Sequence, residues 1–181
     1  MPRFVTTMAL ALALFGCATA GMVDYARLPA GFYPADPDDA ALQETYRMFG
    51  AGGEVPASLQ ARARGFAALE YVTGALQVSG RWDGIGGLAG AQLMIARRDG
   101  RQALGIQPTA KSQAIVDALL AVSQTSNDAA LIAALANPVF SLGAPASLER
   151  LRNLPDLTEI GYALRTVAQG LNAQQYPQDI N

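Results

Sequence analysis

The chain has 181 residues and a formal net charge of −2; 51% of its residues are apolar and 15% are charged. This composition supports one folded domain and excludes a chain that is disordered throughout, because disorder requires low hydropathy and high net charge. The small negative charge and the lack of a Lys/Arg run argue against nucleic acid as a partner. With no histidine and one cysteine, intramolecular disulfides, Cys/His zinc sites and imidazole-dependent triads are excluded.

The first 16 residues have the pattern of a signal peptide. Arg3 gives a positive start, and residues 8–15 (MALALALF) form an uninterrupted apolar run. This run is too short to cross a hydrocarbon core of ~30 Å as a helix, which takes about 20 residues. Its length matches the apolar region of a secretory signal, so we expect the chain to be exported.

The segment Leu14-Phe15-Gly16-Cys17 resembles the lipobox of bacterial lipoproteins, with Phe15 at a position that is usually small. The resemblance implies that Cys17 carries the lipid and that the protein is anchored on the periplasmic side of the cell envelope. Ala18 stands in place of the Asp associated with inner-membrane retention, which implies the outer membrane. The alternative is cleavage after residues 18–20 (ATA), which would release a soluble periplasmic or secreted chain.

Beyond the signal peptide, the sequence predicts a lipidated N-terminus and tether over residues 17–37 and one helical domain over residues 38–181. The tether is interrupted by Pro and Gly. The domain is rich in Ala and poor in β-branched and aromatic residues, so we expect an all-α fold, a compact bundle of about five to seven helices. Periodic apolar positions, caps and breakers predict helices over about 38–49, 58–78, 87–104, 109–123, 129–136, 145–152 and 156–174.

Two of these helices carry specific expectations about the core. In the helix over 87–104, Leu88, Ala91 and Ile95 are expected to point inward. The helix over 156–174 has the most regular apolar stripe in the chain, which predicts a central place in the core. The stripe consists of Leu157, Ile160, Leu164, Val167 and Leu171.

Two motifs that resemble ligand sites have a structural explanation. Residues 84–89 (GIGGLA) match the G-x-G-x-x-A string of dinucleotide-binding turns, but a predicted helix precedes them where that motif needs a strand. Asp36, Asp38 and Asp39 suit the N-terminus of a helix better than a calcium loop, because the glycine and final Glu of such a loop are missing. We therefore expect no cofactor or metal site here.

Candidate catalytic pairs are equally weak. Lys111 and Ser112 are neighbours on a predicted helix, where their side chains diverge by about 100°, so they are not expected to form a nucleophile pair. Glu44 and Glu70 are the carboxylates that an acid/base glycan hydrolase would use, but nothing in the sequence brings them together. The sequence therefore assigns no catalytic residue.

Trp82 follows Arg81 in a glycine-rich turn and has two interpretations. It is either an exposed anchor for a partner or the membrane surface, with Arg81 beside it, or a ring that packs over the end of the bundle. The second interpretation is favoured, because tryptophan is highly buried on average.

Three functional hypotheses remain. The leading one is a non-enzymatic, periplasm-facing lipoprotein that acts as a scaffold, assembly factor or accessory subunit of a cell-envelope complex. Its partners would be the membrane, through the lipid, and an envelope protein, and it would need no cofactor. The second is a helical module that holds a lipid or other apolar ligand in a cavity near Phe66, Leu119 and Leu164. The third is a carboxylate-dependent envelope hydrolase.

Overall fold

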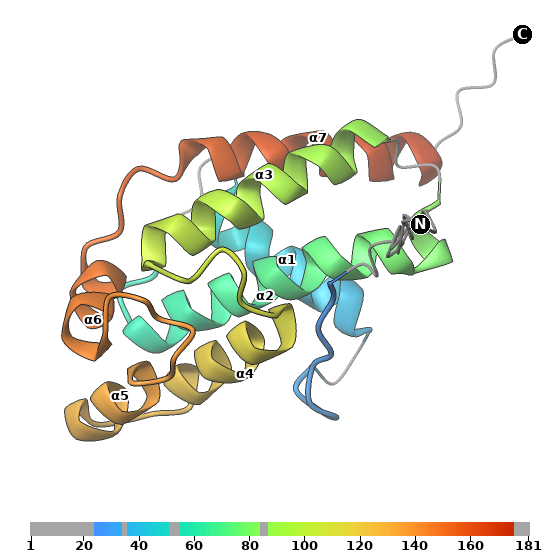
Figure 1. Ribbon diagram of the computed structural model, residues 1–181. Coiled ribbons are helices and arrows are strands. Elements are labelled where there is room, and N and C mark those ends of the chain that lie inside the picture. Colours follow the sequence, from blue (N-terminus) through green and yellow to red (C-terminus); the bar gives the residue numbers. More distant parts are fainter. Residues whose placement is uncertain (1–23, 34–35, 51–54, 84–86, 176–181) are drawn as a thin grey trace, which may run out of the picture.

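The computed structural model describes residues 24–33, 36–50, 55–83 and 87–175 of the chain, and over these residues the fold is helical (Figure 1). The expected all-α class is confirmed. A single antiparallel bridge, between Ile106 and Phe140, is the β pairing present in the described part. The helices are α1 (Pro37–Phe49), α2 (Leu59–Val78), η1 (Gly80–Trp82), α3 (Gly87–Leu104), α4 (Ser112–Ser123), α5 (Asp128–Leu135), α6 (Ala144–Arg152) and α7 (Thr158–Gln175).

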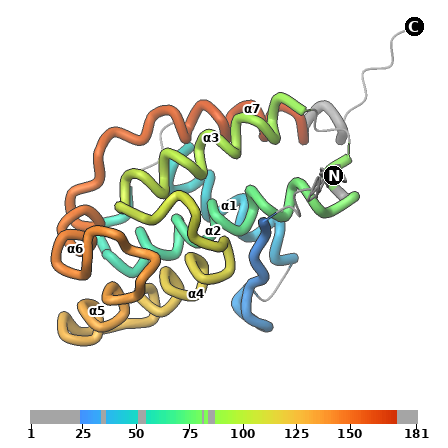
Figure 2. Tube along the Cα trace, in the orientation of Figure 1, coloured from blue at the N-terminus to red at the C-terminus, as the bar shows by residue number. Residues whose placement is uncertain are grey.

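The helix at the centre of the bundle is α2. It packs against α1, α3 and α4, and α7 lies along α3 on the side away from α4 (Figures 1 and 2). Its middle section is buried on every side, from Gly65 to Ala75 without interruption. That section is rich in Ala and Gly, so neighbouring helices can approach its backbone closely from several directions.

Local sequence sets the starts of α1, α2 and α5. The Asp36 carboxylate accepts hydrogen bonds from the backbone N–H groups of Asp38 and Asp39 at the start of α1, at 3.0 and 3.3 Å. Ser58 and Asn127 cap α2 and α5 in the same way. These side chains satisfy backbone donors that have no partner within the helix, which is why the starts were predictable.

The start of α4 differs from the sequence-based expectation. Residues 107–110 form a turn closed by the bond from Ala110 N to Gln107 O at 3.0 Å, and α4 begins only at Ser112. The Arg101 guanidinium donates to the carbonyl oxygens of Pro108 and Ala110, at 3.1 and 3.2 Å. A long-range contact therefore holds this turn out of the helix.

The orientation of α3 corrects another expectation. Leu88, Ala91 and Ile95 are exposed, and Leu88 keeps 66% of its surface accessible. The buried face instead consists mainly of small residues: Ala89, Leu93, Ala96, Gly100, Ala103 and Leu104. A Cβ atom at Gly100 would lie 3.2 Å from Leu69 Cδ2, so this face permits the close approach to α2. Close packing through small side chains outweighs burial of the larger ones on the other face.

The stripe on α7 lies in the core as expected. Ile160, Leu164 and Val167 have no accessible surface, and Leu157 and Leu171 pack against the core from its edge. The helix nevertheless covers α3 and α1 from one side, whereas the central position belongs to α2. Across the described residues, no helix is both long and apolar enough to span a membrane.

Candidate functional site

A polar cluster lies inside the bundle, where α2, α3 and α4 meet the N-terminal strap, which we define as residues 24–33. Its centre is Glu70 of α2, whose side chain is only 4% exposed. Arg101 of α3 binds both carboxylate oxygens of Glu70, through Nη2 to Oε1 and through Nε to Oε2, the second at 3.0 Å. This two-point contact is the strongest geometry available to an arginine and a carboxylate.

Ser112 connects this ion pair to the strap. Its hydroxyl lies 2.6 Å from Glu70 Oε1 and 3.0 Å from Asp24 Oδ2. Arg97 donates to the Asp24 carbonyl oxygen at 3.2 Å and to Ser112 Oγ at 3.3 Å, and its Nη1 lies 3.7 Å from Glu70 Oε1. Four segments that are distant in the sequence are thereby joined through one network.

Asp24 also completes the N-terminus of α4. The residue before that helix, Lys111, makes no side-chain capping bond, and the Ser112 backbone N–H donates to the Asp24 carboxylate instead. A carboxylate at a helix N-terminus is stabilised by the unpaired N–H groups and by the helix dipole. The strap therefore supplies a cap that the local sequence lacks.

The charges in the cluster compensate one another. Burial acts to lower the pKa of Arg101, but the hydrogen bond and charge of Glu70, together with the charge of Asp24, outweigh it and raise that pKa. Burial lowers the pKa of Arg97, and the charge of Glu70 offsets part of this effect. The two guanidinium groups of Arg97 and Arg101 face the two carboxylates of Glu70 and Asp24 in one ion cluster. Removing any one of these four groups would leave a charge without compensation.

An arginine-lined pocket opens on the outer side of this cluster. It has a volume of about 630 Å³. Arg97, Arg98 and Arg101 reach it from α3, and Arg150 reaches it from α6. Its apolar walls include Met94, Ile106 and Leu142, and no carboxylate is among its lining residues. The pocket thus combines a cationic side with an apolar side.

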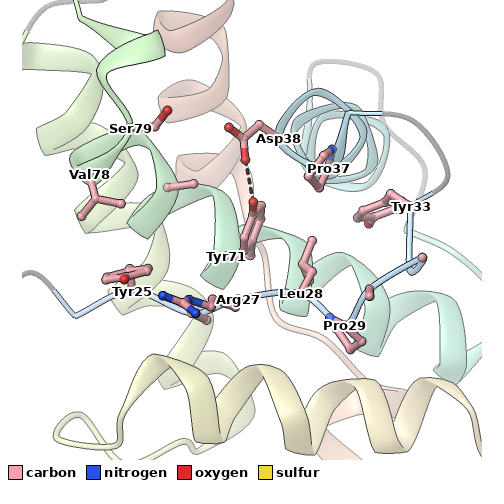
Figure 3. Close-up of a pocket in the computed structure, with 14 residues that line it drawn as sticks. Tyr25, Arg27, Leu28, Pro29, Tyr33, Pro37, Asp38, Tyr71, Val78 and Ser79 are labelled. Carbon is pink, nitrogen blue, oxygen red and sulfur yellow. Dashed lines mark hydrogen bonds between the residues drawn. The ribbon is translucent and has the colours of Figure 1, made fainter.

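A second pocket, of about 460 Å³, lies between the strap and the surface of α2 (Figure 3). Tyr71 points from α2 toward the start of α1, where its hydroxyl donates to Asp38 Oδ1 at 2.6 Å. Burial raises the pKa of Tyr71, and the bond to Asp38 and the charge of Asp38 raise it further. The strap can lie this close to α2 because Gly74 has no side chain. A Cβ atom at Gly74 would be 2.8 Å from Tyr25 Cβ, which is too close for a real contact.

The strap is held on α4 as well as on α2. The backbone N–H of Arg27 donates to Gln113 Oε1 at 2.8 Å, and Gln113 Nε2 donates to the Arg27 carbonyl oxygen at 3.1 Å. Ala26, next to Arg27, is buried. Within the stretch that the sequence indicated as a tether, Leu28, Phe32 and Tyr33 pack against the core, so residues 24–33 lie across the domain.

The carboxylates Glu44 and Glu70 belong to two different ion-pair clusters. Glu44 of α1 contacts Arg47 at 3.2 Å and Arg64 at 3.5 Å, whereas Glu70 contacts Arg97 and Arg101. Each carboxylate is thus neutralised by arginines. The structure does not form the acid/base pair that a glycan hydrolase would need.

The other residues singled out in the sequence are also accounted for where the structure describes them. Lys111 is exposed and Ser112 is buried, so the two side chains diverge as expected. Trp82 is buried in the core at 6% exposure, which matches the packing interpretation and corrects its alternative role as an exposed anchor. Cys17 and the side chain of Arg81 lie outside the described part of the chain.

One signal for the polar cluster was present in the sequence and unrecognised. Glu70 interrupts an otherwise apolar section of α2, from Gly65 to Ala75. A charge in an apolar section of a helix requires a partner, but the sequence does not say which residue supplies it. The roles of Ser112 and Asp24 depended on contacts across 42 and 88 residues.

Comparison with protein-family models, with curated proteins and with solved structures finds no match for this chain. Within the described residues, no group of three or more His, Cys, Asp or Glu side chains is placed to hold a metal ion.

Proposed function

We propose that this chain is a lipid-anchored, periplasm-facing protein that acts without catalysis as a scaffold, assembly factor or accessory subunit of a cell-envelope complex. The lipobox-like segment ending at Cys17 supports the anchor, and the docked strap supports a position next to the membrane. Outer-membrane attachment follows from Ala18 by the same resemblance.

The observation that carries the proposal is the fixed position of Asp24. Its side chain and its carbonyl oxygen are both bound by the bundle, so the described part of the fold is tied to the bundle from its first residue. Asp24 is seven positions from Cys17, with six residues between them. At no more than 3.3–3.6 Å per residue, a lipid on Cys17 would hold the domain within about 25 Å of the membrane surface. We call residues 18–23, between Cys17 and Asp24, the leash. A leash this short suits a protein whose partner is embedded in that membrane or lies on it.

The polar groups inside the bundle also support a non-catalytic role. Glu70 and Ser112 are buried and bonded to one another, and their remaining contacts are made by arginines and by Asp24. These bonds stabilise a fixed arrangement of helices. A reacting carboxylate or nucleophile needs access to substrate, which neither of these two side chains has.

The geometry does not favour the alternative of an apolar ligand in the bundle core. The enclosed space beside Phe66 and Leu119 measures about 10 Å³, which is close to the minimum for one water molecule. Leu164 is fully buried, and the space it lines is a surface groove between α1 and α7.

The anchor is tested by mass spectrometry of the mature N-terminus purified from bacterial membranes. We expect a diacylated or triacylated Cys17. An unmodified chain that begins at Gly21 would refute the anchor and favour release into the periplasm. Cys17→Ser serves as the control and should move the protein from the membrane fraction to the soluble fraction or leave it unprocessed.

The accessory role is tested by affinity purification from detergent-solubilised membranes after chemical cross-linking. The wild-type chain should recover a defined set of envelope proteins, and a chain with about 20 Gly/Ser residues inserted after Thr19 should recover less of it, because a longer leash lowers the local concentration of the domain at the membrane. Equal recovery with both leashes, or no reproducible partner, would contradict the proposed membrane-proximal complex.

A further inference from the structure

The arginine-lined pocket between α3 and α6 has the chemistry of an amphiphilic anion site. Four guanidinium groups line it together with Met94, Ile106 and Leu142, and its volume of about 630 Å³ suits a small ligand. Guanidinium groups bind phosphate oxygens through paired N–H donors and are less strongly hydrated than ammonium groups. A ligand for this pocket needs a negative group for the arginines and an apolar part for the opposite wall.

The four arginines are not equally available. Arg101 uses its N–H groups on Glu70, Ser112 and the turn that precedes α4. By contrast, Arg98 is 70% exposed and pairs with the neighbouring Asp99 at 3.0 Å, a type of surface pair that contributes little and exchanges readily. Arg150 directs only Nη1 to the carbonyl oxygens of Gln102 and Ala103. Arg97 donates to the Asp24 carbonyl oxygen, Ser112 Oγ and Met94 Sδ. Arg98 and Arg150 are therefore the arginines whose N–H groups are least engaged within the domain.

The position of the pocket points to the membrane as the source of the ligand. Arg97, which lines the pocket, donates to the carbonyl oxygen of Asp24, where the strap enters the bundle. The outer face of α3 continues from the pocket with exposed apolar side chains: Leu88 at 66%, Met94 at 40% and Ile95 at 40%. Basic side chains next to exposed apolar ones are typical of surfaces that contact anionic lipid.

We propose that this pocket binds the phosphate group of an anionic membrane phospholipid, with Arg98 and Arg150 as the main ligands and the outer face of α3 against the lipid surface. The inference rests on the proposed function only for the source of the ligand, since the short leash would present the pocket to the membrane. A phospholipid and a free phosphate ester would be recognised here by the same chemistry, which is a phosphate group bound by arginines next to apolar side chains.

The test uses the unlipidated chain from Ala18 to the end. The core residues run from Ala26 to Leu171, so this chain retains every described contact. Binding is measured by flotation with vesicles of phosphatidylcholine alone and of phosphatidylcholine with phosphatidylglycerol. We expect binding to the anionic vesicles only. Soluble dihexanoyl phosphatidylglycerol should compete, and inorganic phosphate should compete no better than chloride at equal ionic strength.

The deciding variant is Arg98→Gln/Arg150→Gln, which changes two exposed side chains and should fold normally by circular dichroism. Its affinity for anionic vesicles should fall about tenfold or more, since a basic residue at an anionic surface contributes on the order of 1 kcal/mol. The control is Arg47→Gln/Arg152→Gln, which removes the same charge from two exposed arginines that do not line the pocket and should change affinity less than about twofold.

Three results would overturn the proposal: no preference for anionic vesicles, an equal loss in the control variant, or competition by inorganic phosphate as strong as that by the short-chain lipid. The third would identify free phosphate as the ligand. Because the chain tested carries no lipid, these outcomes do not depend on whether Cys17 is acylated. The mass of the native N-terminus decides that question separately.

Discussion

The backbone N–H of Ser112 donates to both carboxylate oxygens of Asp24, at 3.1 and 3.3 Å, although 88 residues separate the two in the sequence. This contact makes the N-terminal strap the cap of α4. It also adds a second carboxylate to the buried cluster of Glu70, Arg97 and Arg101. The strap is therefore held by the same residues that hold α2, α3 and α4 together.

Replacing Asp24 should loosen the strap. Asp24→Ala removes a charged cap and the acceptor of the Ser112 hydroxyl, so we expect a loss of about 1–2 kcal/mol in the free energy of unfolding. Trypsin should also cleave faster after Arg27, which is exposed on the strap. Urea titration and timed proteolysis measure the two effects. Asp128→Asn, an exposed change at the start of α5, is the control. An Asp24→Ala protein that matches it in both assays would show that other contacts hold the strap.

Glu70 should be among the most sensitive positions in the chain. Glu70→Gln keeps the shape of the side chain but leaves Arg97 and Arg101 facing each other without their main counter-charge. Breaking a buried pair in this way costs about 3–5 kcal/mol. Denaturant titration measures it, with Glu149→Gln as the exposed control at less than about 1 kcal/mol. A Glu70→Gln cost within the control range would mean that the cluster is solvated in solution.

The double variant Glu70→Gln/Arg101→Met separates loss of the pair from exposure of a single charge. If an uncompensated guanidinium causes most of the destabilisation in Glu70→Gln, removing Arg101 as well should recover part of the lost free energy of unfolding. The losses in the two single variants should then add to more than the loss in the double variant. Additive costs would show that the two residues act independently. The measurement is the same denaturant titration for all four proteins of the cycle.

Leu164 tests the packing of α7. Its side chain is fully buried, so Leu164→Ala should reduce the free energy of unfolding by about 2–5 kcal/mol through lost burial and a residual cavity. Leu88→Ala, at 66% exposure, should change it by less than about 0.5 kcal/mol. A cost below ~1 kcal/mol for Leu164→Ala would indicate that α7 is not fixed to α3 and α1 in solution.

The raised pKa of Tyr71 predicts that the free energy of unfolding depends on pH in the alkaline range. Its pKa in the folded state lies above the ordinary value of 10.0, through burial first and then through Asp38. The folded state therefore holds this proton more tightly than the unfolded state, and the resulting stability is present below pH 10 and is lost as the pH rises through the folded pKa. Spectrophotometric titration should show fewer tyrosines ionising near pH 10 than in urea, because burial raises the pKa of Tyr33 as well as that of Tyr71.

The matched variant is Tyr71→Phe, which removes the hydroxyl bound to Asp38. It should cost about 1–2 kcal/mol at neutral pH because the hydrogen bond goes to a charged acceptor. It should also reduce the number of late-ionising tyrosines by one. If that number is unchanged in Tyr71→Phe, then Tyr71 is not among them, and Tyr33, whose pKa is raised by burial, accounts for the late transition.

The helices themselves were determined by local sequence. Residues such as Ser58 and Asn127 cap helices within three positions of their own place in the chain, and the apolar stripe of α7 has the period of a helix. These signals act over a few residues and need no knowledge of the fold. The all-α class and the bounds of α3 follow from them directly.

What only the tertiary structure decided is which faces meet and which charges pair. Leu88 and Ile95 fit an inward face by periodicity, but the small residues around Gly100 allow closer packing and turn the larger ones outward. Glu70, Ser112 and Asp24 carry no mutual signal in the sequence, because their contacts form only when α2, α4 and the strap converge. Sequence period identifies an apolar face, but shape complementarity and charge compensation select its partner.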